Sequence, residues 1–181
     1  PSYVFYDYET FGLHRSLDRV AQFGGIRTDL DFNIIEEPIN LYCQQSEDYC
    51  PSPQAILVTG ITPEICNERG IPEAQFAHRI HREFSRPNTT ILGYNSIRFD
   101  DEVTRALFYL NLINPYSYIY ENGNARGDLI DLTRATYALR PEGVEWPMDE
   151  SGKASLKLEN LTQANRLPHG AAHDALSDVY A

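Results

Sequence analysis

Two carboxylates lie close together near the start of the chain, inside a run of aromatic residues. In the stretch "FYDYETFG", Asp7 and Glu9 are two positions apart. Side chains on a β-strand alternate between its faces, so both carboxylates would project from the same side. Their oxygens could bind a hard cation such as Mg²⁺. Taken alone, the pair favours a simpler interpretation, the solvated polar end of an edge strand, because Asp-x-Glu is a common spacing.

A second acidic pair follows a predicted buried strand in the middle of the chain. In "GYNSIRFDDE", Asp100 and Asp101 open a predicted helix. Acids at a helix N-terminus accept hydrogen bonds from free backbone N–H groups and suit the helix dipole, so either residue could be only a cap. A carboxylate at the carboxyl end of a strand also lies where open α/β sheets bind ligands. Both interpretations stay open for this segment.

A histidine and an acid come together near the end of the chain, in "HGAAHDALSD". His173 precedes the last predicted helix, which starts at Asp174, and Asp178 lies little over one turn into it. A histidine in a loop of small residues can turn toward a ligand while a helical carboxylate stays fixed. The alternative is a surface histidine beside an ordinary exposed acid, and this segment alone does not distinguish the two.

Apolar spacing and turn signals predict the elements that must position these residues. β-Favouring runs predict strands at residues 3–8, 21–28, 39–43 and 89–95, with a turn at residues 28–33. One helix is predicted to start at Thr62, with Pro63 at its first position. Helical periodicity predicts the others over residues 73–84, 100–112, 128–140 and 155–166, followed by the last one from Asp174.

The remaining segments are predicted to be loops. Residues 114–127 are rich in Tyr, Asn and Gly and indicate a loop with short helical pieces, and residues 142–154 form a long polar loop. The order is three strands, helix, strand and then helices. It predicts an α/β fold with a mixed sheet flanked by helices.

Composition limits the class of protein. A chain of 181 residues with 42% hydrophobic residues suits one folded domain. No apolar run approaches the roughly 20 residues of a membrane span, and no signal-peptide pattern opens the chain. Three cysteines without a CxxC pair indicate neither a disulfide framework nor a zinc site, and we expect a cytoplasmic protein. The net charge of −11 argues against non-specific nucleic-acid binding but leaves room for a nuclease whose acids hold cations.

The acidic and histidine segments form an ordered set that resembles a known superfamily. Asp7, Glu9, an Asp at a mid-chain helix start and His-x-x-x-x-Asp near the end are similar to the DEDD exonucleases, in their histidine-bearing (DEDDh) branch. The words "DYETFG", "GYNSIRFDDEVTR", "YALRPEGVEWP", "KLENLTQAN" and "AHDALSDVYA" resemble the exodeoxyribonuclease I family of single-strand-specific 3′→5′ enzymes. The resemblance covers essentially all 181 residues.

The resemblance implies a ribonuclease H-like fold over residues 1–181, as the exonuclease domain of a longer protein. It assigns metal binding to Asp7, Glu9, Asp100 and Asp178, and the general base to His173. The implied cofactor is a pair of Mg²⁺ ions, for which Mn²⁺ would substitute, that activate water and stabilise the leaving 3′ oxygen. Asp7 would bridge both ions, Glu9 and Asp178 would serve the nucleophile side, and Asp100 the leaving-group side.

The resemblance also implies contacts with single-stranded DNA, from residues that track the backbone or stack on bases. They are Glu9, Lys157, Arg105, Tyr116, Tyr120 and Arg134. Relatives carry Arg at the position of Lys157, so the bidentate phosphate geometry of a guanidinium is lost there. The family further implies single-strand DNA-binding protein as a partner, through regions outside this chain, and no membrane.

The predicted function is therefore Mg²⁺-dependent 3′→5′ degradation of single-stranded DNA to 5′-mononucleotides. An RNA exonuclease or a proofreading-type DEDDh nuclease is an alternative, because the same five residue types serve both substrates. A second alternative is a single-strand-binding module without catalysis, which the intact set of five argues against. A domain with incidental acids would require the whole ordered set to be a coincidence.

Overall fold

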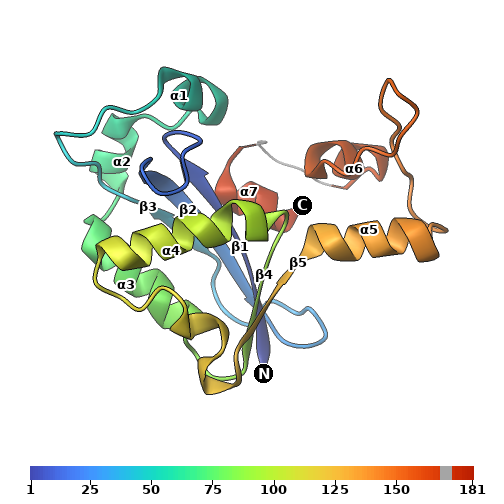
Figure 1. The fold of residues 1–181 in the computed structure, drawn as a ribbon, viewed down its shortest axis with the longest axis horizontal. Helices are drawn as coiled ribbons and strands as arrows, with labels where there is room; N and C mark the ends of the chain where they lie inside the picture. The colour runs from blue at the N-terminus through green and yellow to red at the C-terminus, as the bar shows by residue number, and fades with distance from the viewer. Residues whose placement is uncertain (168–172) are drawn as a thin grey trace.

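A five-stranded mixed sheet forms the centre of the computed structural model, which describes residues 1–167 and 173–181 (Figure 1). The strands are β1 (Ser2–Thr10), β2 (Val20–Thr28), β3 (Ile39–Tyr42), β4 (Thr89–Gly93) and β5 (Ala125–Asp128). Their order across the sheet is β3-β2-β1-β4-β5. β1 pairs antiparallel with β2 and parallel with β4, so the strand that carries Asp7 and Glu9 is central, not an edge strand.

Alternation along β1 separates a buried aromatic face from an acidic one. Val4, Tyr6 and Tyr8 point into the main core, whereas Asp7 and Glu9 point to the opposite face. The core is completed by apolar residues of α3 (Glu73–Phe84) and α4 (Asp100–Leu110). The short α7 (Ala175–Tyr180) instead packs against β1 and β2.

The predicted helix starts agree with the structure in the first half of the chain. α2 (Pro63–Arg69) begins after Thr62, whose side-chain oxygen accepts a hydrogen bond from the backbone N–H of Ile65 at 3.3 Å. α3 buries Phe76, Ile80 and Phe84 as the spacing predicts. α1 (Pro53–Thr59) was not predicted; it is a short helix without a buried residue that ends at Gly60, where φ is +69°.

Two helices form an arm beside the sheet (Figure 1). They are α5 (Leu129–Leu139) and α6 (Leu158–Ala164), joined by the predicted polar loop. The prediction that α6 begins at residue 155 was wrong, because Leu158 is its first residue and Lys157 is extended, with φ −71° and ψ 135°. Short 3₁₀ turns occupy Ser96–Arg98, Ser117–Ile119 and Glu121–Gly123.

β5 corrects the predicted loop over residues 114–127. Its sequence, Ala-Arg-Gly-Asp, has neither alternation nor β-branched residues, so no local signal marks it as a strand. Parallel pairing with β4 defines it, in the register Ile91–Arg126 and Gly93–Asp128. Strand formation here depends on a partner distant in sequence.

None of the helices in the described part of the chain is both long and apolar enough to cross a membrane.

Candidate active site

The two acids of β1 lie opposite two residues of β2 that contact the start of α7. Asp7 pairs with Gly24 and Glu9 with Gln22 in the antiparallel register. A Cβ atom at Gly24 would lie 2.4 Å from the carbonyl carbon of Ala175, so only a glycine lets α7 lie this close to the strand. The sequence thus brings the last helix directly over the acidic face of β1.

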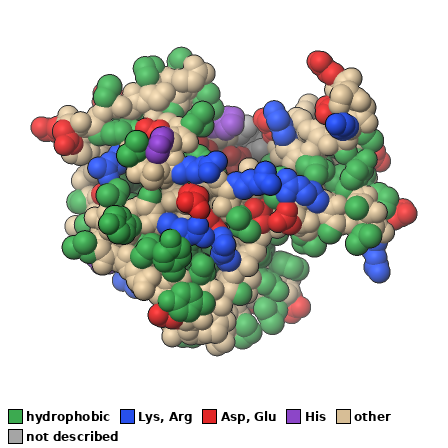
Figure 2. Space-filling view, in the orientation of Figure 1, with side chains coloured by type: hydrophobic (Ala, Val, Ile, Leu, Met, Phe, Trp, Pro, Cys, Tyr) green, Lys and Arg blue, Asp and Glu red, His purple; other side chains and the backbone are tan. Residues whose placement is uncertain are grey.

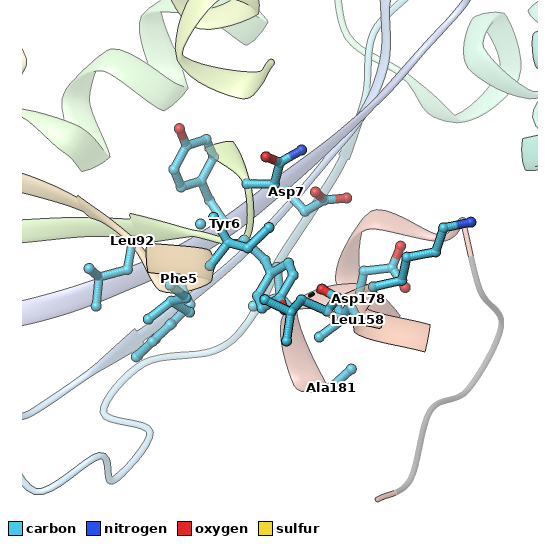
Figure 3. Close-up of a pocket in the computed structure, with 15 residues that line it drawn as sticks. Phe5, Tyr6, Asp7, Leu92, Leu158, Asp178 and Ala181 are labelled. Atoms are coloured by element: carbon cyan, nitrogen blue, oxygen red, sulfur yellow. Dashed lines mark hydrogen bonds between the residues drawn. The ribbon is translucent and has the colours of Figure 1, made fainter. Parts of the chain in front are cut away.

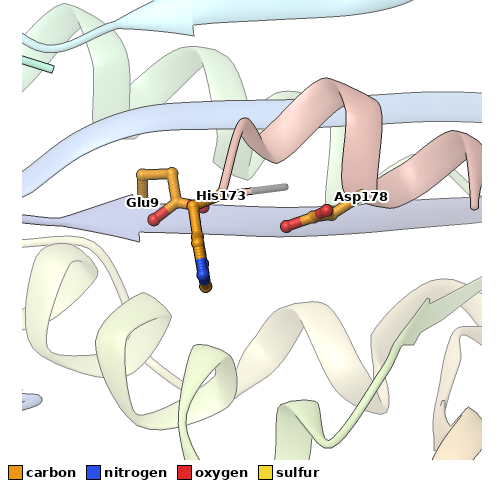
Figure 4. A group of neighbouring side chains, drawn as sticks. All are labelled: Glu9, His173 and Asp178. Atoms are coloured by element: carbon orange, nitrogen blue, oxygen red, sulfur yellow. The ribbon is translucent and has the colours of Figure 1, made fainter. Parts of the chain in front are cut away.

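α7 and the residue before its N-cap bring two further groups to that face (Figure 4). Ligand atoms of Glu9, His173 and Asp178 all lie within 4.8 Å of one another, an arrangement that could hold a metal ion. Asp174 caps the helix by accepting from the backbone N–H of Ser177 at 3.0 Å. His173 has φ +64°, which turns the chain immediately before this cap. The rest of the small-residue loop, residues 168–172, lies outside the described residues.

The Asp100–Asp101 pair divides into two different roles. Asp101 accepts a hydrogen bond from the Tyr6 hydroxyl at 2.8 Å and forms an ion pair with Arg126 of β5. Asp100 is 4% exposed, and its Oδ1 has no hydrogen-bond partner among the described residues. Its negative charge is close enough to raise the pKa of Asp7. Asp100 therefore belongs to the acidic cluster, and Asp101 fixes the start of α4.

Burial and neighbouring carboxylates raise the pKa values of Asp7, Glu9 and Asp100. Burial, followed by the charges of Asp100, Glu9 and Asp178, raises the pKa of Asp7 well above its ordinary value. Burial and then the charge of Asp178 raise the pKa of Glu9 to about 8. Burial raises the pKa of Asp100 to about 7, although backbone hydrogen bonds oppose this. The ionised cluster is unfavourable unless a cation faces it.

A pocket extends from the acids toward the arm (Figure 3). Asp7, Asp178 and Lys157 line it together with apolar side chains of β1, β4, α5 and α6. The hydroxyl of Tyr94 donates to the backbone carbonyl of Leu156 at 2.6 Å, which holds the extended segment before α6 beside the pocket. The structure therefore places Lys157 in a pocket that it shares with Asp7 and Asp178.

The other residues expected to contact substrate lie farther out. Arg105 lies over the ring of Tyr116, 5.4 Å from its centroid, and pairs with Glu102 at 2.5 Å in a separate hollow. Tyr120 is 61% exposed. Arg134 pairs with Asp131 at 2.6 Å on α5. Figure 2 shows Lys and Arg side chains gathered between the α4 region and the arm, with Asp and Glu side chains among them.

Comparison with known proteins identifies the family. The family model described as "Exonuclease" matches residues 4–181, nearly the whole chain. The chain belongs to the exonuclease family. Exodeoxyribonuclease I of Haemophilus influenzae is 59% identical over 180 residues, which cover 99% of this chain and 38% of the relative. The corresponding protein of Escherichia coli is 54% identical, also over 99% of this chain and 38% of its own length.

Solved exonuclease structures confirm the predicted fold. E. coli exonuclease I in complex with a dA16 oligonucleotide superposes with a TM-score of 0.97 at 54% identity, over 99% of this chain and 38% of that one. A zinc-bound complex of the same enzyme with single-stranded DNA gives 0.95 at 54% identity, over 99% of this chain and 38% of that one. The predicted ribonuclease H-like mixed sheet is therefore correct. The chain spans well under half of the relatives that it matches.

The exonuclease site suits a divalent cation on chemical grounds. Carboxylate oxygens are the ligands that Mg²⁺ and Mn²⁺ prefer, and Zn²⁺ also accepts an imidazole nitrogen. The buried Oδ1 of Asp100, which has no partner in the described part of the chain, and the raised pKa of Glu9 both indicate missing positive charge. The residues present therefore fit a divalent metal site.

Residues that support the exonuclease site were missed in the sequence. Gln22, Tyr94, Arg126 and Asp174 contact the site segments without belonging to the matched acid and histidine set. Gln22 carried a usable signal, because a long amide side chain inside the apolar run "VAQFGGI" must find hydrogen-bond partners when buried. No signal in the sequence identifies Arg126, because β5, the strand that carries it, was not predicted.

Proposed function

We propose that this domain is a divalent-metal-dependent 3′→5′ exonuclease that degrades single-stranded DNA and releases 5′-mononucleotides. The convergence of Glu9, His173 and Asp178 from the two ends of the chain carries this proposal. It is supported by the identity of 54% to an E. coli enzyme crystallised with DNA oligonucleotides. Those relatives are much longer, so the substrate is inferred for this chain.

Mg²⁺ is the proposed cofactor, with Mn²⁺ as a substitute, and when bound it would activate water and stabilise the leaving oxygen. Asp7, Glu9, Asp100 and Asp178 would hold two ions, with Asp7 shared between them. His173 is exposed and borders this group, where its imidazole can take the proton of the attacking water. The pairing of Asp101 with Tyr6 keeps the adjacent Asp100 directed to the site.

The single-stranded DNA would enter along the face that carries the Lys and Arg side chains between α4 and the arm (Figure 2). Lys157 lies in the pocket with Asp7 and Asp178 and would neutralise a phosphate near the 3′ end, while Glu9 would contact the terminal sugar. Arg105 and Tyr116 form a cation–aromatic pair on which a base can stack. Tyr120 and Arg134 would continue the path. Single-strand DNA-binding protein is a proposed partner through regions outside this chain, supported by a solved structure of an ExoI/SSB-Ct complex.

Digestion of 5′-labelled single-stranded DNA and RNA oligomers with Mg²⁺ tests the proposal. We expect stepwise shortening from the 3′ end, faster on DNA, that stops in EDTA. Asp178→Asn should abolish the reaction and His173→Ala should strongly reduce it, while Asp31→Asn, which alters an exposed carboxylate in the β2–β3 turn, should have no effect. Preferential loss of RNA would favour the RNA exonuclease, and binding without any digestion would favour the non-catalytic module. The cytoplasmic location stays a prediction.

A further inference from the structure

Gln22 is a fully buried polar side chain in the middle of the apolar strand β2, with 0% exposure. It lies directly opposite Glu9 in the β1–β2 register. Its Nε2 donates to Asp174 Oδ2 at 2.8 Å and to Asn40 Oδ1 at 3.0 Å. Its Oε1 accepts from the backbone N–H of Ala175 at 3.1 Å. Both ends of one amide are used, and two of the bonds go to the start of α7.

Asp174 transmits this contact to the reacting groups. It directly follows His173 in the chain. Its other carboxylate oxygen, Oδ1, accepts from the backbone N–H and the hydroxyl of Ser177, at 3.0 and 2.9 Å. Its carbonyl oxygen accepts from the backbone N–H of Asp178 at 3.0 Å. The contact of Asp174 with Gln22 of β2 therefore sets where both His173 and Asp178 lie relative to Glu9.

We propose that Gln22 is a positioning residue of the exonuclease site, which holds the first turn of α7 at the distance from β1 that lets Glu9 and Asp178 share a cation with the His173 imidazole beside it. The role in catalysis rests on the proposed function, whereas the role in cation binding does not. α7 has six residues, so it is too short to be stable by itself and depends on such contacts. Gly24 allows the close approach, and Gln22 fixes it.

Two single variants break the contact in different ways. In Asp174→Asn the helix cap is kept, because Asn caps as well as Asp, but every arrangement of the two amides leaves N–H groups facing each other. Gln22→Met keeps the length of the side chain and removes all its hydrogen bonds. Gln45→Met is the matched control: the amide of Gln45 also donates two hydrogen bonds, to the backbone carbonyls of Val20 and Cys43 at 2.9 and 2.6 Å, but neither partner is part of α7.

Mn²⁺ binding, followed by the loss of the free-ion EPR signal, gives a readout independent of turnover. We expect Asp174→Asn and Gln22→Met to weaken Mn²⁺ binding and lower kcat by about 10- to 100-fold, as supporting residues of metal sites do. KM for the oligonucleotide should change little, and Gln45→Met should match the wild type in both readouts. Gln22→Glu combined with Asp174→Asn exchanges donor and acceptor and should recover most of the lost affinity.

The outcomes separate this inference from the proposed function. Mn²⁺ affinity and kcat equal to those of Gln45→Met in either single variant would overturn the positioning role, even if the melting temperature falls. Failure of the double variant to recover any Mn²⁺ affinity would also overturn it. If Gln22→Met does not fold, Asp174→Asn decides alone. A wild type that binds Mn²⁺ but digests no DNA would refute the proposed function, and the Mn²⁺ titration would still test Gln22.

Discussion

Asp7 of β1 lies directly opposite Gly24 of β2, and the space that this glycine leaves above the sheet is filled by the backbone of Ala175. One residue type on a neighbouring strand thus decides whether the last helix can reach the acids of the first strand. Each of the two β1 acids lies opposite a β2 residue that contacts α7, since Gln22, which lies opposite Glu9, accepts a hydrogen bond from the backbone N–H of Ala175. The site is built on this strand pair.

Gly24→Ala should therefore separate α7 from β1. The added Cβ would lie 2.4 Å from Ala175 backbone atoms that cannot move independently, which should destabilise the protein by about 1–3 kcal/mol. We expect weaker Mn²⁺ binding and slower digestion together with a lower melting temperature. Gly127→Ala on β5 is the control, because its Cβ would meet only the flexible end of Leu92, at 3.0 Å. Full activity in Gly24→Ala would contradict the packing argument.

Asp100→Asn and Asp101→Asn should have opposite effects. Asp100→Asn removes a buried charge whose pKa is raised, so in EDTA the variant should be at least as stable as the wild type, but inactive. Asp101→Asn leaves Arg126 without its ionic partner and should cost about 1–3 kcal/mol of stability. Urea denaturation in EDTA and digestion with Mg²⁺ measure the two effects. If Asp100→Asn were fully active but destabilised, Asp100 would be the structural residue and not a member of the cation site.

Stability without metal should fall as the pH rises. Glu9 has a folded-state pKa of about 8, above the ordinary value of about 4.3, so the folded protein holds its proton more tightly than the unfolded chain. The resulting stabilisation is complete below the unfolded value and is lost as the pH rises through about 8. Asp100, at about 7, adds in the same direction.

A divalent cation should reverse this trend. We expect the increase in melting temperature on adding Mg²⁺ or Mn²⁺ to be small near pH 5 and large near pH 8, because protons and cations compete for the same carboxylates. Glu9→Gln should flatten the dependence in EDTA. A melting temperature in EDTA that rises from pH 5 to 8 would contradict the electrostatic description of the cluster.

Lys157 provides a test of the substrate path. Lys157→Ala should weaken binding of single-stranded DNA uniformly across sequences and reduce the slope of log K against log salt concentration by about one. The chain contains one other lysine, Lys153, which is exposed in the polar loop and gives the matched control, Lys153→Ala. Fluorescence anisotropy with Ca²⁺ in place of Mg²⁺, to slow digestion, measures both. Equal salt slopes in the two variants would remove Lys157 from the path.

Much of the fold could be predicted because its signals are local. The aromatic alternation of β1, the spacing of Phe76, Ile80 and Phe84, and the cap at Thr62 each determine one element within a few residues. β5 could not be predicted, since its pairing with β4 and the contact of Arg126 with Asp101 are tertiary.

In the site too, residue types could be predicted from the sequence, whereas tertiary contacts could not. The ordered acids and histidine were visible as residue types, and the structure brings Glu9, His173 and Asp178 together. The residues of this segment alone left Asp100 and Asp101 undistinguished, and only the family resemblance selected Asp100. The difference depends on which carboxylate reaches the Tyr6 hydroxyl. The sequence also assigned the Asp7–Glu9 pair alone to an edge strand, whereas partners on both sides make β1 central.

The location of α7 on β1 and β2 has a consequence for synthesis of the protein. The first strands leave the ribosome long before the residues that complete the cation site, so a nascent chain displays Asp7 and Glu9 without Asp178. The cation site can therefore form only once α7 has emerged and docked.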